Sequence, residues 1–153
     1  MVRVVSPGSV MAESSVRAPK TAAPQKPPAA RNWPAFRGVL AGLREFVPPA
    51  FPVSVRIGRV ARGTLGTCRR ERNRFVITIA RDLDEEPAIE VLLHEWAHAL
   101  SWSLSLDKLS RASDTTREAF EAASNDAAWG CAYARIWRVY STLVTTKGFG
   151  EQG

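Results

Sequence analysis

The chain is poor in the residue types that build disulfide and zinc-ribbon frameworks. It has two cysteines, Cys68 and Cys131, and two histidines among 153 residues. Two widely separated thiols predict no disulfide framework, and the chain contains no CxxC pair. It also lacks a sustained apolar segment at its start and any apolar run long enough to cross a membrane. We therefore expect a soluble, cytoplasmic protein with no membrane contact.

Aromatic residues are missing from residues 1–30, which contain five prolines. Such a segment cannot bury enough apolar surface to offset the entropy lost on ordering, so we expect a disordered Pro/Ala-rich tail there. The remaining composition suits one globular domain with a core, which we place at residues 31–147. Residues 148–153 are expected to form a frayed C-terminus.

Acidic residues are scarce between Arg56 and Arg74, where seven arginines accompany the single acid Glu71. The whole chain carries a formal net charge of +6. Two interpretations remain open for the Arg56–Arg74 region. It is either a solvated loop between strands or a patch that faces the phosphates of a nucleic acid.

The hydrophobic pattern predicts a mixture of helices and strands. Helical spacing covers residues 33–47, and alternation over 51–58 and a β-branched run over 74–80 indicate strands. Residues 58–73 look like a loop or a ragged hairpin. A further helix should begin after Asp84 and end near Trp102, followed by a polar stretch. Later helices should begin at a Thr115–Glu118 capping box and after residues 124–126.

The segment "LLHEWAHAL" holds both histidines four residues apart. On a helix, His94 and His98 then lie on one face and can bind one metal ion, for which neutral imidazole is a standard zinc ligand. Glu95 lies about 100° around the helix and can act on water as a general base. The alternative is a structural histidine pair. Imidazoles on a largely apolar helix are costly without a partner, which favours Zn²⁺.

The third zinc ligand is not evident, because no third histidine exists. The sequence leaves a carboxylate, Asn125 or a thiol. Asp107 is too close to the end of the same helix, and Glu118 and Glu121 suit the solvated start of a capped helix. Asp126 is balanced between a metal ligand and a simple helix N-cap. The candidates after the metal helix are Asp107, Asp114, Glu118, Glu121, Asn125 and Asp126.

"VLLHEWAHAL" followed by "NDAAWGCAYARIW" resembles the SprT-like zinc metallopeptidases, especially the small versions in phage and bacterial genomes. The resemblance covers roughly residues 34–140. It implies an α+β, zincin-like minidomain with a short β-sheet packed on the HExxH helix and a long C-terminal helix. The third histidine of that family falls on Asn125 here. "DAAWG" is also similar to the D-x-x-Y-G pattern of the aspzincin peptidases, which favours Asp126 as the third ligand.

The resemblance implies a zinc-dependent peptidase that cleaves proteins or peptides, including proteins associated with nucleic acid. Tyr133 and Tyr140 are candidates for stabilising the oxyanion. The alternative is a non-catalytic nucleic-acid-binding or virion-associated module with a structural or vestigial zinc site, which includes an inactive relative of the peptidases. The small phage versions make a phage-encoded or virion-associated protein a further expectation.

Overall fold

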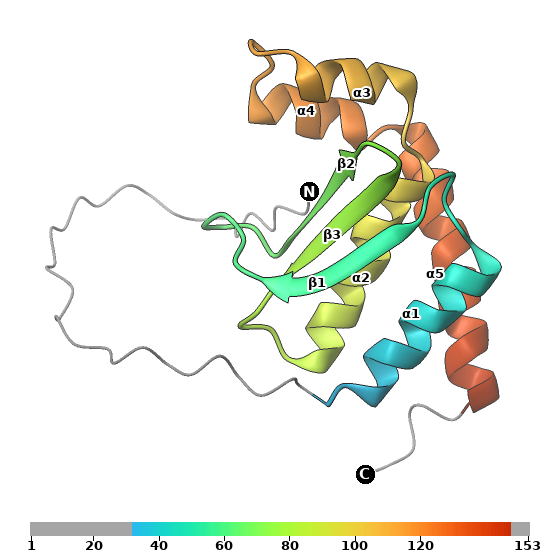
Figure 1. The fold of residues 1–153 in the computed structure, drawn as a ribbon. Helices are drawn as coiled ribbons and strands as arrows, with labels where there is room; N and C mark the ends of the chain where they lie inside the picture. The colour runs from blue at the N-terminus through green and yellow to red at the C-terminus, as the bar shows by residue number, and fades with distance from the viewer. Residues whose placement is uncertain (1–31, 148–153) are drawn as a thin grey trace, which may run out of the picture.

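The computed structural model of the chain describes residues 32–147. The predicted tail at residues 1–30 and the predicted frayed end at 148–153 lie outside this range. The described residues form an α+β structure with five helices and one three-stranded sheet. Helices α1, α2 and α5 lie on one side of the sheet, and α3 and α4 form a separate pair at one end of it (Figure 1).

Helix α1 (Pro34–Phe46) confirms the first predicted helix. Its first residue is a proline, whose fixed φ suits that position. No side chain of Trp33 caps it; instead the carboxylate of Glu85 accepts a hydrogen bond from the Phe36 amide at 3.0 Å. This hydrogen bond therefore joins the start of α1 to the start of the next helix along the chain, whose first residue is Glu85.

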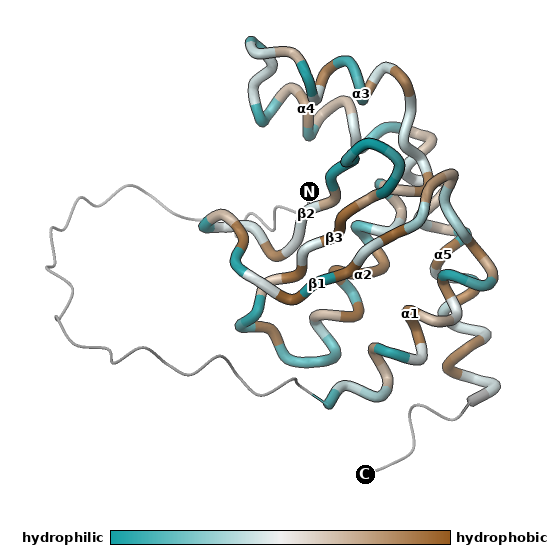
Figure 2. Tube along the Cα trace, viewed as in Figure 1, coloured by the Kyte–Doolittle hydropathy of each residue, from teal (hydrophilic) through white to brown (hydrophobic). Residues whose placement is uncertain are grey.

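The sheet has the strand order β1-β3-β2, with β1 (Val53–Gly58), β2 (Gly66–Glu71) and β3 (Arg74–Ala80). Strand β1 runs parallel to β3, and β2 runs antiparallel to it. The bounds of β3 match the predicted strand. Residues 58–73, predicted as a loop or a ragged hairpin, contain β2, which pairs with β3; the turn joining β2 and β3 is strongly hydrophilic (Figure 2).

Helix α2 (Glu85–Leu100) lies under the sheet and is buried along most of its length. Trp96 is fully buried and donates its indole N–H to the carbonyl of Val47 at 2.8 Å. The predicted N-cap, Asp84, occupies the cap position but makes no side-chain cap hydrogen bond. The helix ends two residues before the predicted Trp102.

Two helices differ from the sequence prediction. The polar stretch after α2 contains α3 (Leu104–Arg111), whose start is capped by Ser103 accepting from the Leu106 amide. Helix α4 (Arg117–Ser124) is capped by Thr116 and not by Thr115, because the Thr116 hydroxyl accepts from the Ala119 amide. The predicted capping box therefore lies one residue too early.

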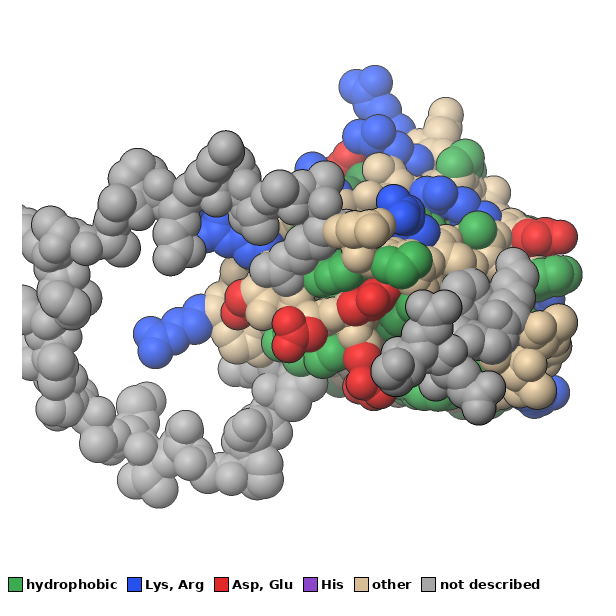
Figure 3. Space-filling view, turned by 90° about the horizontal axis from the view of Figure 1, so that it is seen from below, with side chains coloured by type: hydrophobic (Ala, Val, Ile, Leu, Met, Phe, Trp, Pro, Cys, Tyr) green, Lys and Arg blue, Asp and Glu red, His purple; other side chains and the backbone are tan. Residues whose placement is uncertain are grey.

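Helix α5 (Ala127–Lys147) is the long C-terminal helix, and it packs on α1 and α2. None of the helices in the described range is both long and apolar enough to span a membrane. Acidic side chains gather at the end of the molecule where α2 begins (Figure 3), where Asp82, Asp84, Glu86 and Glu90 are exposed. Seven arginines lie between Arg56 and Arg74, on the strands and their connections, so charge is distributed unevenly.

Candidate metal centre

The side chains of His94 and His98 converge on the face of α2 that packs against α5. Their Nε2 atoms lie 3.2 Å apart, and the ring centroids are 5.0 Å apart. His98 is almost fully buried, whereas His94 is partly exposed. The i, i+4 spacing predicted this common face, and the structure places both rings on it.

The separation of the two nitrogens suits two ligands of one zinc ion. Zn–N bonds of 2.0–2.1 Å in tetrahedral geometry place two ligand nitrogens about 3.3 Å apart. The same separation also fits a hydrogen bond between one protonated and one unprotonated ring nitrogen. The geometry of the pair is therefore compatible with a shared metal and with a metal-free histidine pair.

Burial keeps both imidazoles neutral. It lowers the pKa of His94 from 6.5 to about 4 and that of His98 to about 2. The neighbouring His94 adds to the effect on the pKa of His98, and the backbone of Ser124 acts in the opposite direction. Neutral imidazole is the form that binds metal, so both side chains are in their ligand form at neutral pH.

Glu95 lies on another face of α2, under strand β2, and its exposed fraction is 0%. A Cβ atom added to Gly66 would lie 3.2 Å from the Glu95 Cγ, which places this carboxylate close beneath the start of β2. Glu95 also raises the pKa of the buried Cys68 thiol, although desolvation by burial is the larger cause. Cys68 and the exposed Cys131 are both free thiols.

An aromatic cluster from α5 covers the histidine pair. The ring of Trp129 lies 4.7 Å from that of His94 and 5.5 Å from that of His98, measured between centroids. Tyr133 stacks on Trp129 at 4.9 Å and meets His94 edge-on at 5.8 Å. The spacing of Trp129 and Tyr133 is helical, but the sequence did not reveal that they pack on the histidines.

Asp126 occupies the N-cap of α5, where its Oδ1 accepts a hydrogen bond from the Trp129 amide at 2.9 Å. Its side chain is exposed. Asn125 is the C-cap of α4 and donates its side-chain amide to the Glu121 carbonyl. Within residues 32–147, no three His, Cys, Asp or Glu side chains are grouped so that they could hold a metal ion. Asp126 therefore lies apart from the histidine pair in this arrangement.

The other candidate ligands have structural surroundings of their own. Asp107 accepts hydrogen bonds from Arg70 and from the indole N–H of Trp102. Glu121 pairs with Arg117 at 3.1 Å. Glu118 lies in the first turn of α4 and is exposed, as is Asp114 before that helix.

The two tyrosines proposed for oxyanion stabilisation lie in different places. Tyr133 touches the His94 ring, as described above. Tyr140 is two turns further along α5, and its pKa is raised by burial and by the nearby charges of Glu86 and Glu90. Of the two, Tyr133 is the one that the structure brings to the histidines.

Comparisons with known proteins do not add to this picture. No protein-family model, no curated protein and no solved structure matches the chain.

Proposed function

We propose that this protein is a zinc-dependent peptidase of the HExxH type, built on a zincin-like minidomain. The observation that carries the proposal is the convergence of the His94 and His98 Nε2 atoms, 3.2 Å apart, on a helix that also buries Glu95. The lowered pKa values of both histidines support it, because they keep the rings available to metal.

His94 and His98 would hold the zinc ion, and a third ligand would come from the turn between α4 and α5. Asp126 remains our candidate for that position, with Asn125 as the alternative. When bound, zinc supplies Lewis-acid polarisation of the scissile carbonyl and makes water easier to deprotonate.

Glu95 would serve as the general base. Its carboxylate accepts a proton from the attacking water and delivers it to the leaving amine. Glu95 is shielded from bulk solvent under β2, which would favour direct proton transfer between the reacting groups. Tyr133 is the candidate to donate a hydrogen bond to the developing oxyanion, because it lies against His94.

The test combines metal analysis with peptide cleavage on the full chain. Wild type should hold one zinc per chain and cleave members of a quenched fluorescent peptide library. His98→Ala should lose stoichiometric zinc. Glu95→Gln keeps the side-chain shape, so it should retain zinc and lose cleavage by at least about a hundredfold, the usual contribution of a general base.

Two results would contradict the proposal. Absence of transition metal in carefully prepared wild type would leave the histidines as a hydrogen-bonded structural pair. Zinc in wild type without Glu95-dependent cleavage would favour the non-catalytic alternative.

One observation favours a second candidate function, which is contact with nucleic acid. The face of the sheet away from α2 carries a hollow of about 450 Å³, and no acidic side chain is among its described lining residues. Arg56, Arg59 and Arg69 line it beside the hydroxyls of Thr67 and Thr78. Arginines and hydroxyls together are typical of contacts to backbone phosphates.

This second candidate is tested by the salt dependence of binding to a labelled oligonucleotide. For duplex DNA, each phosphate contact removed should make the plot of log binding constant against log salt concentration less steep by about 0.9. Arg56→Ala and Arg59→Ala should each do so, whereas Arg135→Ala on the exposed side of α5 should not. Equal slopes in all three variants would reject this surface.

A further inference from the structure

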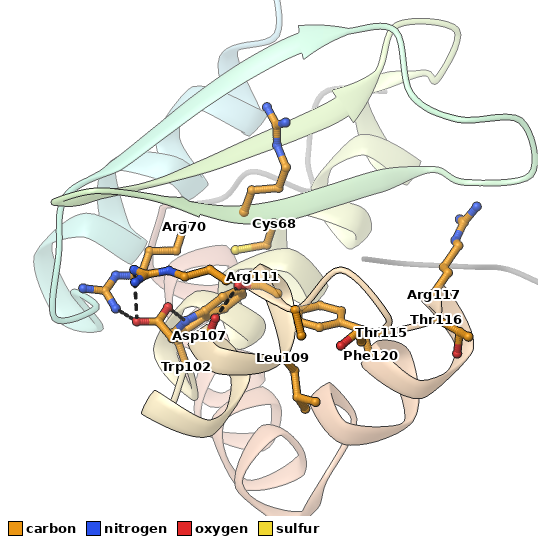
Figure 4. Close-up of a pocket in the computed structure, with 13 residues that line it drawn as sticks. Cys68, Arg70, Trp102, Asp107, Leu109, Arg111, Thr115, Thr116, Arg117 and Phe120 are labelled. Carbon is orange, nitrogen blue, oxygen red and sulfur yellow. Dashed lines mark hydrogen bonds and ion pairs between the residues drawn. The ribbon is translucent and has the colours of Figure 1, made fainter.

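A cavity of about 500 Å³ lies between strand β2 and the pair of helices α3 and α4 (Figure 4). This volume is in the range of pockets that hold small ligands or side chains. Arg69 lines both this cavity and the hollow on the other face of the sheet. The lining of the cavity also includes Cys68, Arg70, Trp102, Asp107, Arg111 and Phe120.

The cavity has an aromatic wall. The rings of Trp102 and Phe120 meet there with centroids 6.0 Å apart, and Leu109 adds aliphatic surface. Trp102 and Phe120 are partly exposed, so they present apolar surface to whatever enters. A flat or bulky apolar side chain would bury that surface.

The charge of the cavity is positive. Its one described acidic lining residue, Asp107, is shared by Arg70, by the Trp102 indole N–H and, at 3.9 Å, by Arg111. One carboxylate thus faces two guanidinium groups. Arg111 is 75% exposed, so most of its five N–H donors remain available to a ligand.

Arg70 and Arg117 differ in how available they are to a ligand. Arg70 is mostly buried, and its Nε lacks a hydrogen-bond partner among the described residues. Arg117 lies at the opposite end of the cavity from Arg70 (Figure 4), where it pairs with Glu121 and contacts Thr64. An anionic group would therefore complement Arg70 and Arg111 better than it would complement Arg117.

The cavity borders the surroundings of Glu95. Cys68 lines the cavity, and the pKa of its thiol is raised by burial and, to a lesser extent, by the charge of Glu95. Gly66, two residues earlier on the same side of β2, packs against Glu95. A peptide bound along β2, which is an edge strand of the sheet, would therefore run from the region of Glu95 towards the cavity.

We propose that this cavity is a specificity pocket that takes an aromatic residue next to an acidic residue of a peptide substrate. The aromatic ring lies against Trp102 and Phe120, and the carboxylate pairs with Arg111. This inference rests on the proposed peptidase function for the identity of the ligand as substrate.

The experiment measures binding without turnover, in the full-length Glu95→Gln protein, using dye-labelled peptides that differ in one dipeptide. The Phe-Glu peptide should bind about tenfold or more tightly than the Phe-Lys and Ala-Glu peptides, because each of those lacks one of the two complementary groups. Arg111→Glu should abolish the preference for Phe-Glu over Phe-Lys. Arg135→Glu, a matched charge reversal at an exposed position on α5, should leave it unchanged.

Equal affinities for the three peptides, or a preference that survives Arg111→Glu, would overturn the inference. The inference would also be overturned by an oligonucleotide that displaces the peptide and whose own binding depends on Arg111. The two proposals fail separately. If wild type holds zinc and cleaves peptides without Arg111-dependent preference, only the pocket assignment fails. If the preference is present and no cleavage occurs, the pocket for an aromatic and an acidic residue stands and the peptidase function fails.

Discussion

The indole ring of Trp129 lies against the imidazole of His94, with ring centroids 4.7 Å apart. Its Nε1 is buried without a hydrogen-bond partner in the described range. Zinc binding at His94 and His98 would change the charge next to this ring, so we predict that zinc titration changes the tryptophan emission of wild type. Trp129→Phe should lose most of that change.

Trp137→Phe is the matched control, because Trp137 lies two turns further along the same helix and contacts Tyr133 and Tyr140. It should retain the zinc response. A response in Trp129→Phe as large as that of wild type would show that Trp129 does not report on the metal.

The stability of the metal-free protein should fall as the pH falls from 6.5 towards 4. The unfolded chain binds protons at its histidines below about pH 6.5, whereas burial keeps His94 neutral to about pH 4 and His98 to about pH 2. The unfolded state therefore binds more protons across this window, and acidification favours it. One fully shielded imidazole would lose about 3 kcal/mol over that interval, and the partial exposure of His94 reduces its share.

Urea unfolding in the presence of a chelator at several pH values measures this effect. The His94→Gln/His98→Gln double variant removes both groups and should show a weaker loss across the same window. A pH dependence identical to that of wild type would mean that these two histidines are not the groups responsible.

Asp126 should contribute to stability as the cap of α5. Asp126→Ala removes the hydrogen bond to the Trp129 amide and should cost about 1 kcal/mol. Asp126→Ser keeps a capping oxygen and should cost less. Chemical denaturation of the metal-free variants measures both values.

The same variants test Asp126 as a zinc ligand. If its carboxylate binds zinc, Asp126→Ala and Asp126→Ser should weaken zinc to a similar extent, although only the first loses the cap. Asn125→His should raise zinc affinity, because the backbone of the adjacent Ser124 already lies beside His98. Unchanged zinc affinity in Asp126→Ser would remove Asp126 from the ligand set.

Gly66→Ala should impair the site because the backbone of β2 approaches α2 closely there. An added Cβ would lie 2.4 Å from Val91 Cγ1 and 3.2 Å from Glu95 Cγ. We expect a loss of about 1–3 kcal/mol in stability, as for other overpacked cores. Cleavage activity, measured where the variant is fully folded, should also fall because Glu95 is displaced.

Gly42→Ala is a comparison away from the site. Its Cβ would lie 2.4 Å from a terminal methyl carbon of Leu143, between α1 and α5. The protein should lose stability while the folded fraction keeps its activity. Equal activity per folded molecule in the two variants would contradict the close packing of Gly66 on Glu95.

The sequence predicted those elements whose patterns are local. The β-branched run of β3 and the i, i+4 histidines depend on neighbours along the chain, and the structure has both where they were expected. Helix α3 was missed because it has only eight residues, of which only Leu106 and Asp107 are buried, so its short polar sequence offers few core positions to recognise.

The remaining features of the site depend on residues far apart in sequence. Arg70 and Asp107, which form an ion pair at the cavity beside α3, are 37 positions apart in the sequence. The covering of His94 by Trp129 requires α5 to cross α2 at one particular place. Spacing along the chain carries no information about such crossings, since they result from the packing of whole helices.

The position of β3 between its two partners also has a consequence for how the chain assembles. Strands β2 and β3 are neighbours in sequence, and Glu71 pairs with Arg74 across their turn. The paired residues of β1 and β3 are 22 positions apart in the sequence, as Val53 and Phe75 are. Because short chain closures form sooner than long ones, the hairpin can nucleate before β1 docks. Strand β1 would then join the sheet last, and its backbone amides would be the first in the sheet to exchange their hydrogens with solvent.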